Sequence, residues 1–565
     1  MTNIADKIDV AVGRKKADLV LKNSLYLNVF SNEFLRADIA ISDGYFVGIG
    51  EYNGIKEIDC SHKTIVPGFI DSHIHLESSI VAPSEFSKIT VQHGTTSIIT
   101  DPHEIANVCG KAGISFMLDV TKKLPIDVYF MIPSCVPATQ FDENGAIIDS
   151  NDVFELLKQD RVLGLAEMMN YYGVLAKDEE VIKKLQHTLD AHKRIDGHAP
   201  FLSGNNLNGY VVSGVATDHE CSTLTEAIEK LQKGLWIMIR EGTACKNFEA
   251  LYPLITQKYY ERCVFATDDK HPEELVKFGH IDYIIKKAIQ KGADKALTYK
   301  VASYNAAKCF GLSHKGAISP GFEADFVILD NADEVAINSV YKKGENISSD
   351  IESSTVVAEE YENIYPEIFN TMHLDSLSVE KIQRENKKLS LIGLIPGEIV
   401  TTDEGYASKI DTKNDILKLC VIERHKNTGH IGISYVKGYG LKKGAIATSI
   451  AHDSHNIIVI GASDKDIVLA VNKIRSLSGG MVVVADGNVI EALPLRIAGL
   501  MSTMKVSAVI QTMNTLKEKA YQLGVSKNID PFMTLSFLSL PVVSKLKLTT
   551  MGVVDVENNT LKEIL

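Results

Sequence analysis

Hydrophobic and polar positions follow one rhythm through the middle of the chain, where short apolar runs alternate with amphipathic helical stretches. Residues 178–193 and 223–234 are two such stretches, with apolar side chains three and four positions apart. Eight apolar runs over about 250 residues predict a (β/α)₈ barrel of the TIM type. An open, doubly wound sheet has the same periodicity and remains the alternative. The eight runs are 64–75, 96–104, 126–135, 162–169, 194–200, 212–220, 235–242 and 263–271.

The segments on either side of this region have the alternation of short β-strands. Residues 18–66 combine it with Asp-Gly and Asn-Gly turn signals, and a related pattern returns at 315–331. We therefore expect a small β-sandwich assembled from residues 1–66 and 315–370, with a short amphipathic helix at its N-terminal end. The barrel would then occupy residues 67–314.

The remaining residues, 371–565, predict a C-terminal α/β domain. Residues 378–388 are helix-like, whereas 415–424, 455–463 and 479–490 are strand-like apolar runs. With 565 residues, the chain is long enough for two to four separate hydrophobic cores.

Composition narrows the classes of partner and compartment. Against 59 Lys and Arg stand 72 Asp and Glu, a net charge of −13, and no long basic block is present. Nucleic acid is therefore not an expected partner. No apolar run approaches the roughly 18 residues of a membrane span, and the first residues lack the apolar core of a secretory signal. The 8 cysteines are scattered singly, which is typical of buried thiols in a reducing compartment, so we expect a cytoplasmic protein.

Candidate chemistry begins at the end of the first apolar run, where His73 and His75 are two positions apart. In a strand, such residues project to the same side. Later runs end in Glu167, His198, His219 and Asp268. Because the C-terminal ends of barrel strands meet on one face, these six side chains should converge there. Four imidazoles and two carboxylates fit two divalent metal ions that share a bridging carboxylate.

These residues resemble the metal-ligand set of the amidohydrolase superfamily, whose flanking β-sandwich also comes from two separated segments. Several phrases are similar to the adenine deaminases of bacteria and archaea within it: PGFIDSHIHLESS, TDPHEIANV, GLAEMMN, DGHAP, TDHE, HDSHNIIV and GLMS. Many relatives bridge the metals with a carboxylated lysine, whereas this chain offers Glu167. The resemblance implies Mn²⁺ or Fe²⁺ rather than Zn²⁺, and a homodimer.

The implied reaction is the hydrolytic deamination of adenine to hypoxanthine and ammonia by a metal-bridged hydroxide. In this interpretation His73, His75 and Asp268 hold one metal, His198 and His219 hold the other, and Glu167 bridges them. Asp268 is also the expected general base. Two alternatives stay open: a cyclic amide hydrolase of the hydantoinase or dihydroorotase type, and a metal-binding scaffold without catalysis.

Other polar residues at the same rim are candidates for contact with the substrate. Protonation of the purine ring calls for an acid, for which Glu77 is the first candidate and Glu104 and Glu220 are others. Asp101, His103 and Glu104 are expected to bind substrate. His452, Asp453 and His455 could form a further metal site by spacing, or a loop that reaches the barrel from the C-terminal domain.

Overall fold

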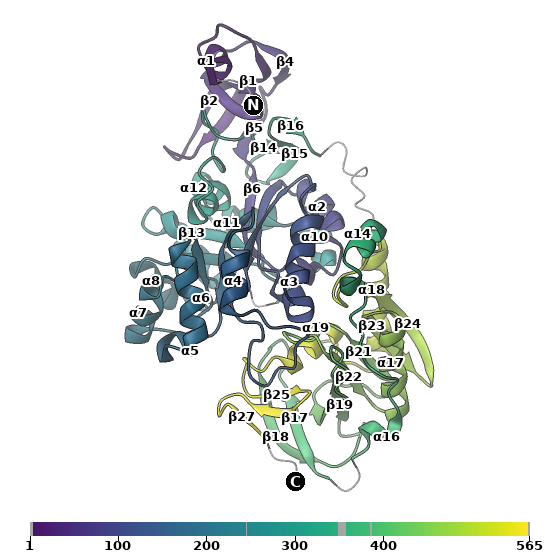
Figure 1. The fold of residues 1–565 in the computed structure, drawn as a ribbon. Coiled ribbons are helices and arrows are strands. Elements are labelled where there is room, and N and C mark those ends of the chain that lie inside the picture. The colour runs from purple at the N-terminus through teal and green to yellow at the C-terminus, as the bar shows by residue number, and fades with distance from the viewer. Residues whose placement is uncertain (1–3, 245, 349–357, 385–386, 563–565) are drawn as a thin grey trace.

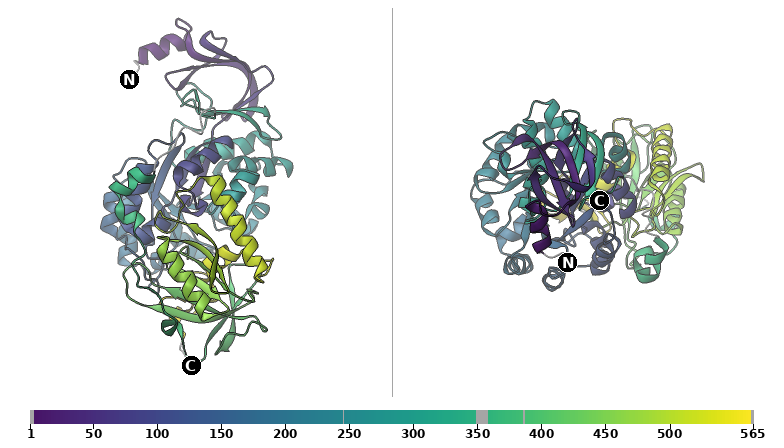
Figure 2. Two further views of the ribbon diagram at one scale, coloured as in Figure 1. Left: turned by 90° about the vertical axis from the view of Figure 1, so that its right-hand side faces the viewer. Right: turned by 90° about the horizontal axis from the view of Figure 1, so that it is seen from above.

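The computed structural model describes residues 4–244, 246–348, 358–384 and 387–562. Parts of the predicted elements therefore lie outside the described residues. They are residues 1–3, Cys245, residues 349–357 of the expected second sandwich segment, and part of the helix expected at 378–388. Three units follow one another along the molecule, with the N-terminal sheet at one end and the C-terminal domain at the other (Figures 1 and 2).

The N-terminal unit is one eight-stranded sheet built from two distant parts of the chain. Strand β14 pairs antiparallel with β5, with Val327 opposite Val66, and so joins the segment after the central unit to the segment before it. The path through the sheet is β16-β15-β14-β5-β1-β2-β3, and β4 pairs with β1. The elements are α1 (Ile4–Ala11), β1 (Ala17–Asn28), β2 (Glu33–Ser42), β3 (Tyr45–Gly50), β4 (Gly54–Asp59), β5 (Thr64–Pro67), β14 (Phe326–Asn331), β15 (Ala336–Lys342) and β16 (Glu345–Asn346).

The central unit has eight strands in two parallel sheets, with helices packed around them. One sheet has the order β10-β9-β8-β7-β6 and the other β11-β12-β13. Several of its strands are buried at every residue, as expected where both faces are covered. The strands of the unit are β6 (Phe69–Ile74), β7 (Thr95–Thr100), β8 (Asp127–Ile132), β9 (Val162–Met168), β10 (Arg194–Gly197), β11 (Thr217–Asp218), β12 (Trp236–Arg240) and β13 (Cys263–Ala266).

Helices of the central unit begin at side-chain caps in several places, because orphan N–H groups of the first turn need acceptors. Asp178 caps α6, Thr223 caps α8 and Asp294 caps α12. The helices are α2 (Pro83–Gln92), α3 (His103–Val120), α4 (Ser150–Leu156), α5 (Tyr171–Ala176), α6 (Glu179–Asp190), α7 (Gly204–Val212), α8 (Leu224–Gln232), α9 (Phe248–Leu251), α10 (Pro272–Phe278), α11 (Ile281–Gln290), α12 (Lys295–Lys300), a π-helical turn η4 (Val301–Asn305) and α13 (Ala306–Cys309), with short 3₁₀ turns η1 (Leu76–Ser79), η2 (Tyr252–Leu254) and η3 (Tyr260–Arg262).

The C-terminal unit is an α/β domain around an eight-stranded sheet of order β18-β17-β20-β19-β22-β21-β23-β24. A three-stranded sheet, β25-β26-β27, completes it. Two short helices, α14 (Ala358–Ile364) and α15 (Pro366–Phe369), precede this domain in the chain. Its elements are α16 (Val379–Ile382), β17 (Leu389–Leu394), β18 (Thr401–Ala407), β19 (Ile416–Ile422), β20 (Ile431–Lys437), β21 (Ala445–Thr448), β22 (Ile457–Gly461), α17 (Asp464–Ser476), β23 (Gly480–Ala485), β24 (Asn488–Pro494), α18 (Val506–Gln522), α19 (Pro531–Ser536), the 3₁₀ turn η6 (Phe537–Ser539), β25 (Leu546–Thr549), β26 (Gly552–Asp555) and β27 (Thr560–Leu561).

The helix expected at 378–388 is much shorter in the structure, where α16 ends at Ile382. The sequence after Ile382 has no apolar residue until Leu389. A further turn of helix would therefore have no apolar stripe to pack, and a short helix without packing is unstable in water.

The C-terminal domain is attached to the central unit by backbone pairing as well as by side chains. The N–H of Ser502 donates to the carbonyl of Ile80 at 2.7 Å, and the N–H of Ala82 donates to Ser502 at 3.1 Å. The N–H of Val506 donates to the Glu85 carboxylate at 2.9 Å. These bonds lie just after β6, so they hold the domain beside the C-terminal ends of the central strands. No helix of the described part of the chain is long and apolar enough to cross a bilayer.

Candidate metal centre

The six side chains singled out at the apolar runs lie together at the C-terminal ends of the central strands. His73 belongs to the end of β6 and Glu167 to the end of β9. The other four follow directly after β6, β10, β11 and β13; they are His75, His198, His219 and Asp268. All are buried except His198, which is half-buried.

Glu167 is the hub of this cluster. Its Oε2 atom lies 2.6 Å from Nδ1 of His198 and 3.1 Å from Nε2 of His219. Its Oε1 atom lies 3.4 Å from Nε2 of His75 and 3.4 Å from Nδ1 of His103. One carboxylate therefore faces donor atoms from both sides, which is the arrangement that a bridging ligand needs.

Asp268 faces the first pair of histidines with one oxygen and a cation with the other. Its Oδ1 atom lies 3.0 Å from Nε2 of His75 and 3.8 Å from Nε2 of His73. Its Oδ2 atom accepts a hydrogen bond from Arg240, which also contacts Glu220. Arg240 was not among the site residues predicted from the sequence. The available signal was its position, because it ends the apolar strand β12 as the other site residues end theirs.

Neighbouring acceptors set the orientation of the first two imidazoles. Nδ1 of His73 lies 3.3 Å from the carboxylate of Asp196, and Nδ1 of His75 lies 3.0 Å from the carbonyl oxygen of Asp101. Since a carbonyl or carboxylate oxygen accepts, each Nδ1 carries a proton, and Nε2 is the ring nitrogen that can offer a lone pair to a metal ion. Metal-binding histidines are oriented in this way.

The electrostatics of the cluster follow from burial combined with close opposite charges. Burial opposes the charged form of Glu167, but hydrogen bonds from His198 and His219 outweigh it and hold its pKa well below the ordinary value. Burial lowers the pKa of His75 and of His219, yet the neighbouring carboxylates raise both well above the ordinary value. The protein thus concentrates carboxylate charge at this point, where a cation could replace the imidazolium protons.

The donor set fits divalent metal ions. Donor atoms of three groups, His73/His75/Asp268, His73/Glu167/His219 and His75/Asp101/His103/Glu167, each lie within 4.8 Å of one another. Among the described residues, the buried atoms Nε2 of His73 and Nδ1 of His219 have no hydrogen-bond partner. Buried polar atoms of this kind are costly unless a ligand satisfies them. Imidazole and carboxylate without thiolate suit Mn²⁺, Fe²⁺ or Zn²⁺.

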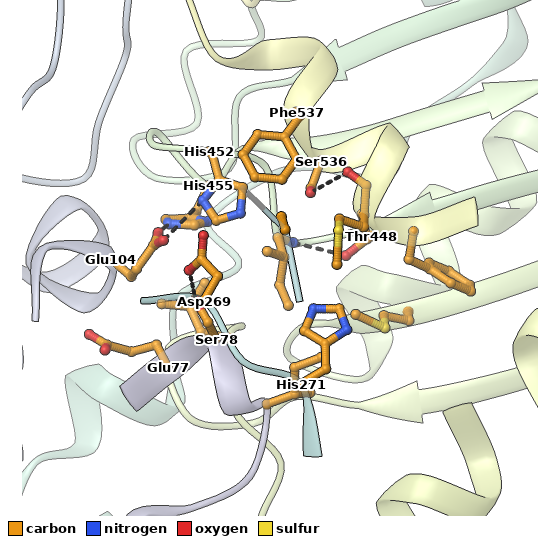
Figure 3. A pocket seen from close by; sticks show the side chains of 17 residues that line it. Glu77, Ser78, Glu104, Asp269, His271, Thr448, His452, His455, Ser536 and Phe537 are labelled. Carbon is orange, nitrogen blue, oxygen red and sulfur yellow. Dashed lines mark hydrogen bonds and ion pairs between the residues drawn. The ribbon is translucent and has the colours of Figure 1, made fainter. Parts of the chain in front are cut away.

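The residues expected to contact substrate divide into two groups. His103 lies 3.1 Å from the Asp101 carboxylate and beside Glu167, so this pair borders the metal cluster. Glu104 instead faces the C-terminal domain, where Nδ1 of His452 lies 2.9 Å from its Oε1 atom and Nε2 of His455 contacts its Oε2 atom. The segment containing His452 thus reaches the mouth of the central unit from the C-terminal domain (Figure 3).

Two of the three candidate acids, Glu77 and Glu220, have opposite environments. Burial raises the pKa of Glu77 to about 7, and its Oε1 atom accepts the N–H of Ile105 at 3.1 Å. Burial opposes the charge of Glu220 too, but Arg240 and the neighbouring histidines hold its pKa well below the ordinary value. Glu77 can therefore carry a proton near neutral pH, whereas Glu220 stays ionised.

Comparison with known proteins shows the family. The model of the amidohydrolase family matches residues 64–351, and that of the adenine deaminase C-terminal domain matches residues 397–560. The chain is 44% identical to "Adenine deaminase" of Clostridium acetobutylicum over 98% of this chain and 99% of that protein. It is 45% identical to "Adenine deaminase 2" of Carboxydothermus hydrogenoformans, covering 98% of each chain.

Among solved structures, the crystal structure of an adenine deaminase aligns with a TM-score of 0.41 and 18% identity, covering 55% of this chain and 90% of that one. The two family models and the near full-length relatives carry the assignment. The chain belongs to the adenine deaminases of the amidohydrolase family.

Proposed function

We propose that this protein hydrolyses adenine to hypoxanthine and ammonia at the cluster around Glu167. The observation that carries the proposal is the set of four histidines and two carboxylates, buried except for His198, at the ends of parallel strands, in a chain of the adenine deaminase family.

The fold that we propose for the central unit is a closed (β/α)₈ barrel. Support comes from the two edges at which its sheets meet. The N–H of Asp268 donates to the carbonyl of His73 at 2.9 Å, between β13 and β6, and the N–H of Ala216 donates to Ile195 at 3.0 Å, between β10 and β11. We further propose that residues 67–314 form this barrel, 1–66 with 315–370 the flanking sandwich, and 371–565 the C-terminal domain.

In this proposal two divalent ions, Mn²⁺ or Fe²⁺, are held by the residues of the cluster. His73, His75 and Asp268 would hold one, His198 and His219 the other, and Glu167 would bridge them. When bound, the ions lower the pKa of water from 15.7 towards about 7 and so make hydroxide available at neutral pH.

The protein side chains have separate tasks in the reaction. A C6–O bond forms as water attacks adenine, and the C6–N bond breaks as ammonia leaves. Asp268 takes the proton of the attacking water and passes it to the departing amine. Glu77, whose pKa burial raises to about 7, gives a proton to the purine ring and regains one from the C6 hydroxyl as the C6=O bond forms. Arg240 fixes the carboxylate of Asp268.

The alternatives are separated by one assay. Purified, Mn²⁺-loaded protein is expected to release ammonia from adenine with loss of the adenine ultraviolet absorbance. Turnover of a hydantoin or dihydropyrimidine without adenine would support the cyclic amide hydrolase instead. Full metal loading with no turnover of either substrate would support the scaffold. Neither alternative is favoured by the near full-length relatives.

The cysteines bear on the proposed location of the protein, and the family resemblance bears on its assembly. The described cysteines are free, and six of the seven are buried, which is consistent with the cytoplasm as the proposed location. A homodimer remains the prediction of the family resemblance.

A further inference from the structure

A cavity lies between the mouth of the central unit and the C-terminal domain (Figure 3). It includes about 550 Å³ when the open solvent at its mouth is counted. Its residues come from both units. Glu77, Glu104 and Asp269 belong to the central unit, and His452 and Phe537 belong to the C-terminal domain. Glu77 and Asp269 are close in sequence to His75 and Asp268, so the cavity opens next to the reacting centre.

One side of the cavity is polar and fixed in place. His452 donates through Nδ1 to Glu104 and stacks on Phe537, with ring centroids 4.7 Å apart and planes at 22°. Since Nδ1 is committed to Glu104, Nε2 is the ring nitrogen that remains for a ligand. Within the described part of the chain, the buried Oε2 atom of Glu77 has no hydrogen-bond partner, and Glu77 also lines the cavity.

His455 makes this arrangement rigid. Its Nδ1 atom accepts the N–H of Ala451 at 3.3 Å, so its Nε2 carries the proton and donates to Glu104. Burial lowers the pKa of His455 to about 4, which keeps the ring neutral. Glu104 is therefore held by two donors from the C-terminal domain, and its own position holds His452. His455 therefore acts on Glu104 as a positioning group.

The other side of the cavity is apolar and comes mainly from the C-terminal domain. Met481 of β23, Leu500, Phe532 and Met533 of α19 line it, with Phe537 at the edge of the polar side. Aromatic and methionine side chains pack well against the face of a flat heteroaromatic ring. A flat ligand with hydrogen-bonding atoms along its rim matches a cavity that has one apolar wall and one polar side.

We propose that the C-terminal domain forms half of the adenine-binding pocket. In this pocket His452 contacts the rim of the purine through Nε2, and the apolar side that contains Met481 and Met533 packs against the face of the purine. This proposal rests on the proposed function. Burial lowers the pKa of His452, but Glu104 outweighs it and raises the value to about 9. Nε2 is therefore a proton donor, and the ring nitrogens of adenine are acceptors.

Two variants of the full-length, metal-loaded enzyme test this pocket from different sides. Met533→Trp fills the apolar side at a residue that is only half-buried, and His452→Gln keeps a donor for Glu104 but removes the ring and its second nitrogen. Val542→Trp is the matched control, because Val542 is 42% exposed in the same domain and does not line the cavity. The readouts are KM and kcat for adenine, the Kd of hypoxanthine by calorimetry, and the metal content.

We expect both variants to raise KM and the hypoxanthine Kd by about tenfold or more, with metal content unchanged and Val542→Trp like the wild type. An unchanged Kd and KM in both variants, with a wild type that deaminates adenine, would overturn the pocket and leave the proposed function standing. Loss of metal in both variants would also overturn it, since the residues would then act on the metal centre. A wild type that neither binds hypoxanthine nor deaminates adenine would overturn both proposals.

Discussion

Arg240 and Asp268 form a buried ion pair in which the guanidinium occupies one carboxylate oxygen and leaves the other to face His75. Both residues are less than a tenth exposed. Burying a charge pair costs desolvation energy, which the attraction between the charges offsets only if further hydrogen bonds hold each partner. Here the second oxygen of Asp268 and the contact of Arg240 with Glu220 provide them.

Replacing Arg240 should impair the reaction without unfolding the protein. Arg240→Met leaves the carboxylate of Asp268 without its cation, so the proposed base loses its fixed orientation. We expect kcat for adenine to fall about 100-fold. Steady-state kinetics would measure this, with Arg262→Met as the control, because Arg262 is exposed and donates to the carbonyl of Gly234. An unchanged kcat would show that Asp268 needs no partner.

Glu167→Gln should remove activity and bound metal together. The amide keeps the size of the carboxylate but has no negative charge to offer to two cations at once. We expect kcat to fall roughly 10³-fold and the metal content per chain to drop. Elemental analysis and ammonia release would measure both, and Glu179→Gln on the exposed face of α6 is the control. Full metal content in Glu167→Gln would contradict the bridging role.

Removal of metal should lower thermal stability as well as activity. A ligand that binds only the folded protein at about 100 times its Kd stabilises it by about 2.7 kcal/mol. Chelation should therefore lower Tm in a melting experiment, and added Mn²⁺ should restore both Tm and deamination. The same treatment should change the Tm of Glu167→Gln less. An equal Tm change in the two proteins would place the stabilising ion elsewhere.

Asp71 should matter for the stability of the central unit. Its carboxylate accepts the N–H of Thr267 at 3.2 Å and its hydroxyl at 2.5 Å, and lies 2.8 Å from Nε2 of His280. These bonds link β6 to the residues after β13. Asp71→Ala leaves buried donors unpaired, and we expect a cost of about 2–4 kcal/mol. Thermal melting would show a lower Tm for Asp71→Ala than for Asp330→Ala, an exposed aspartate; equal Tm values would contradict this.

Lys547 should make stability depend on pH in the alkaline range. Burial lowers its pKa to about 7, although Nζ donates to the carbonyls of Ile399 and Phe537. Because the folded pKa is below the unfolded value of about 10.4, the unfolded state binds more protons between them. The stability that the protein has with a neutral Lys547 is fully present above about pH 10.4. As the pH falls from there towards about 7, the free energy of unfolding decreases by about 1.4 kcal/mol for each pH unit.

Lys547→Met removes this titration while it keeps an unbranched side chain. We expect the rise in Tm between pH 7 and pH 9 to be smaller in the variant than in the wild type. Melting curves at both pH values would measure the difference, and Lys545→Met, at a half-exposed neighbour, is the matched control. A rise as large in Lys547→Met as in the wild type would show that the amine stays protonated throughout.

Some of the fold was accessible from local pattern and some was not. Apolar runs of the central unit predicted its parallel strands, because strands covered on both faces have continuous apolar runs. The prediction of a helix over 378–388 was wrong in extent, since α16 ends at Ile382. Helix-forming residues without an apolar stripe do not form a long helix. Strand β14 pairs with β5 although the partner residues are 259 to 265 positions apart, so only the long-range register of the sheet decides this pairing.

The sequence by itself determined the proposed metal donors, because strand period and strand ends place His73, His75, Glu167, His198, His219 and Asp268 at one edge. Tertiary structure alone decided their partners. Arg240 reaches Asp268 across neighbouring strands, and Glu104 meets His455 across 351 positions. Local patterns determine which side chains point to a surface, whereas the packing of separate domains determines which surfaces face each other. The cavity beside the proposed metal centre depends on domain packing, so the sequence pattern alone did not predict it.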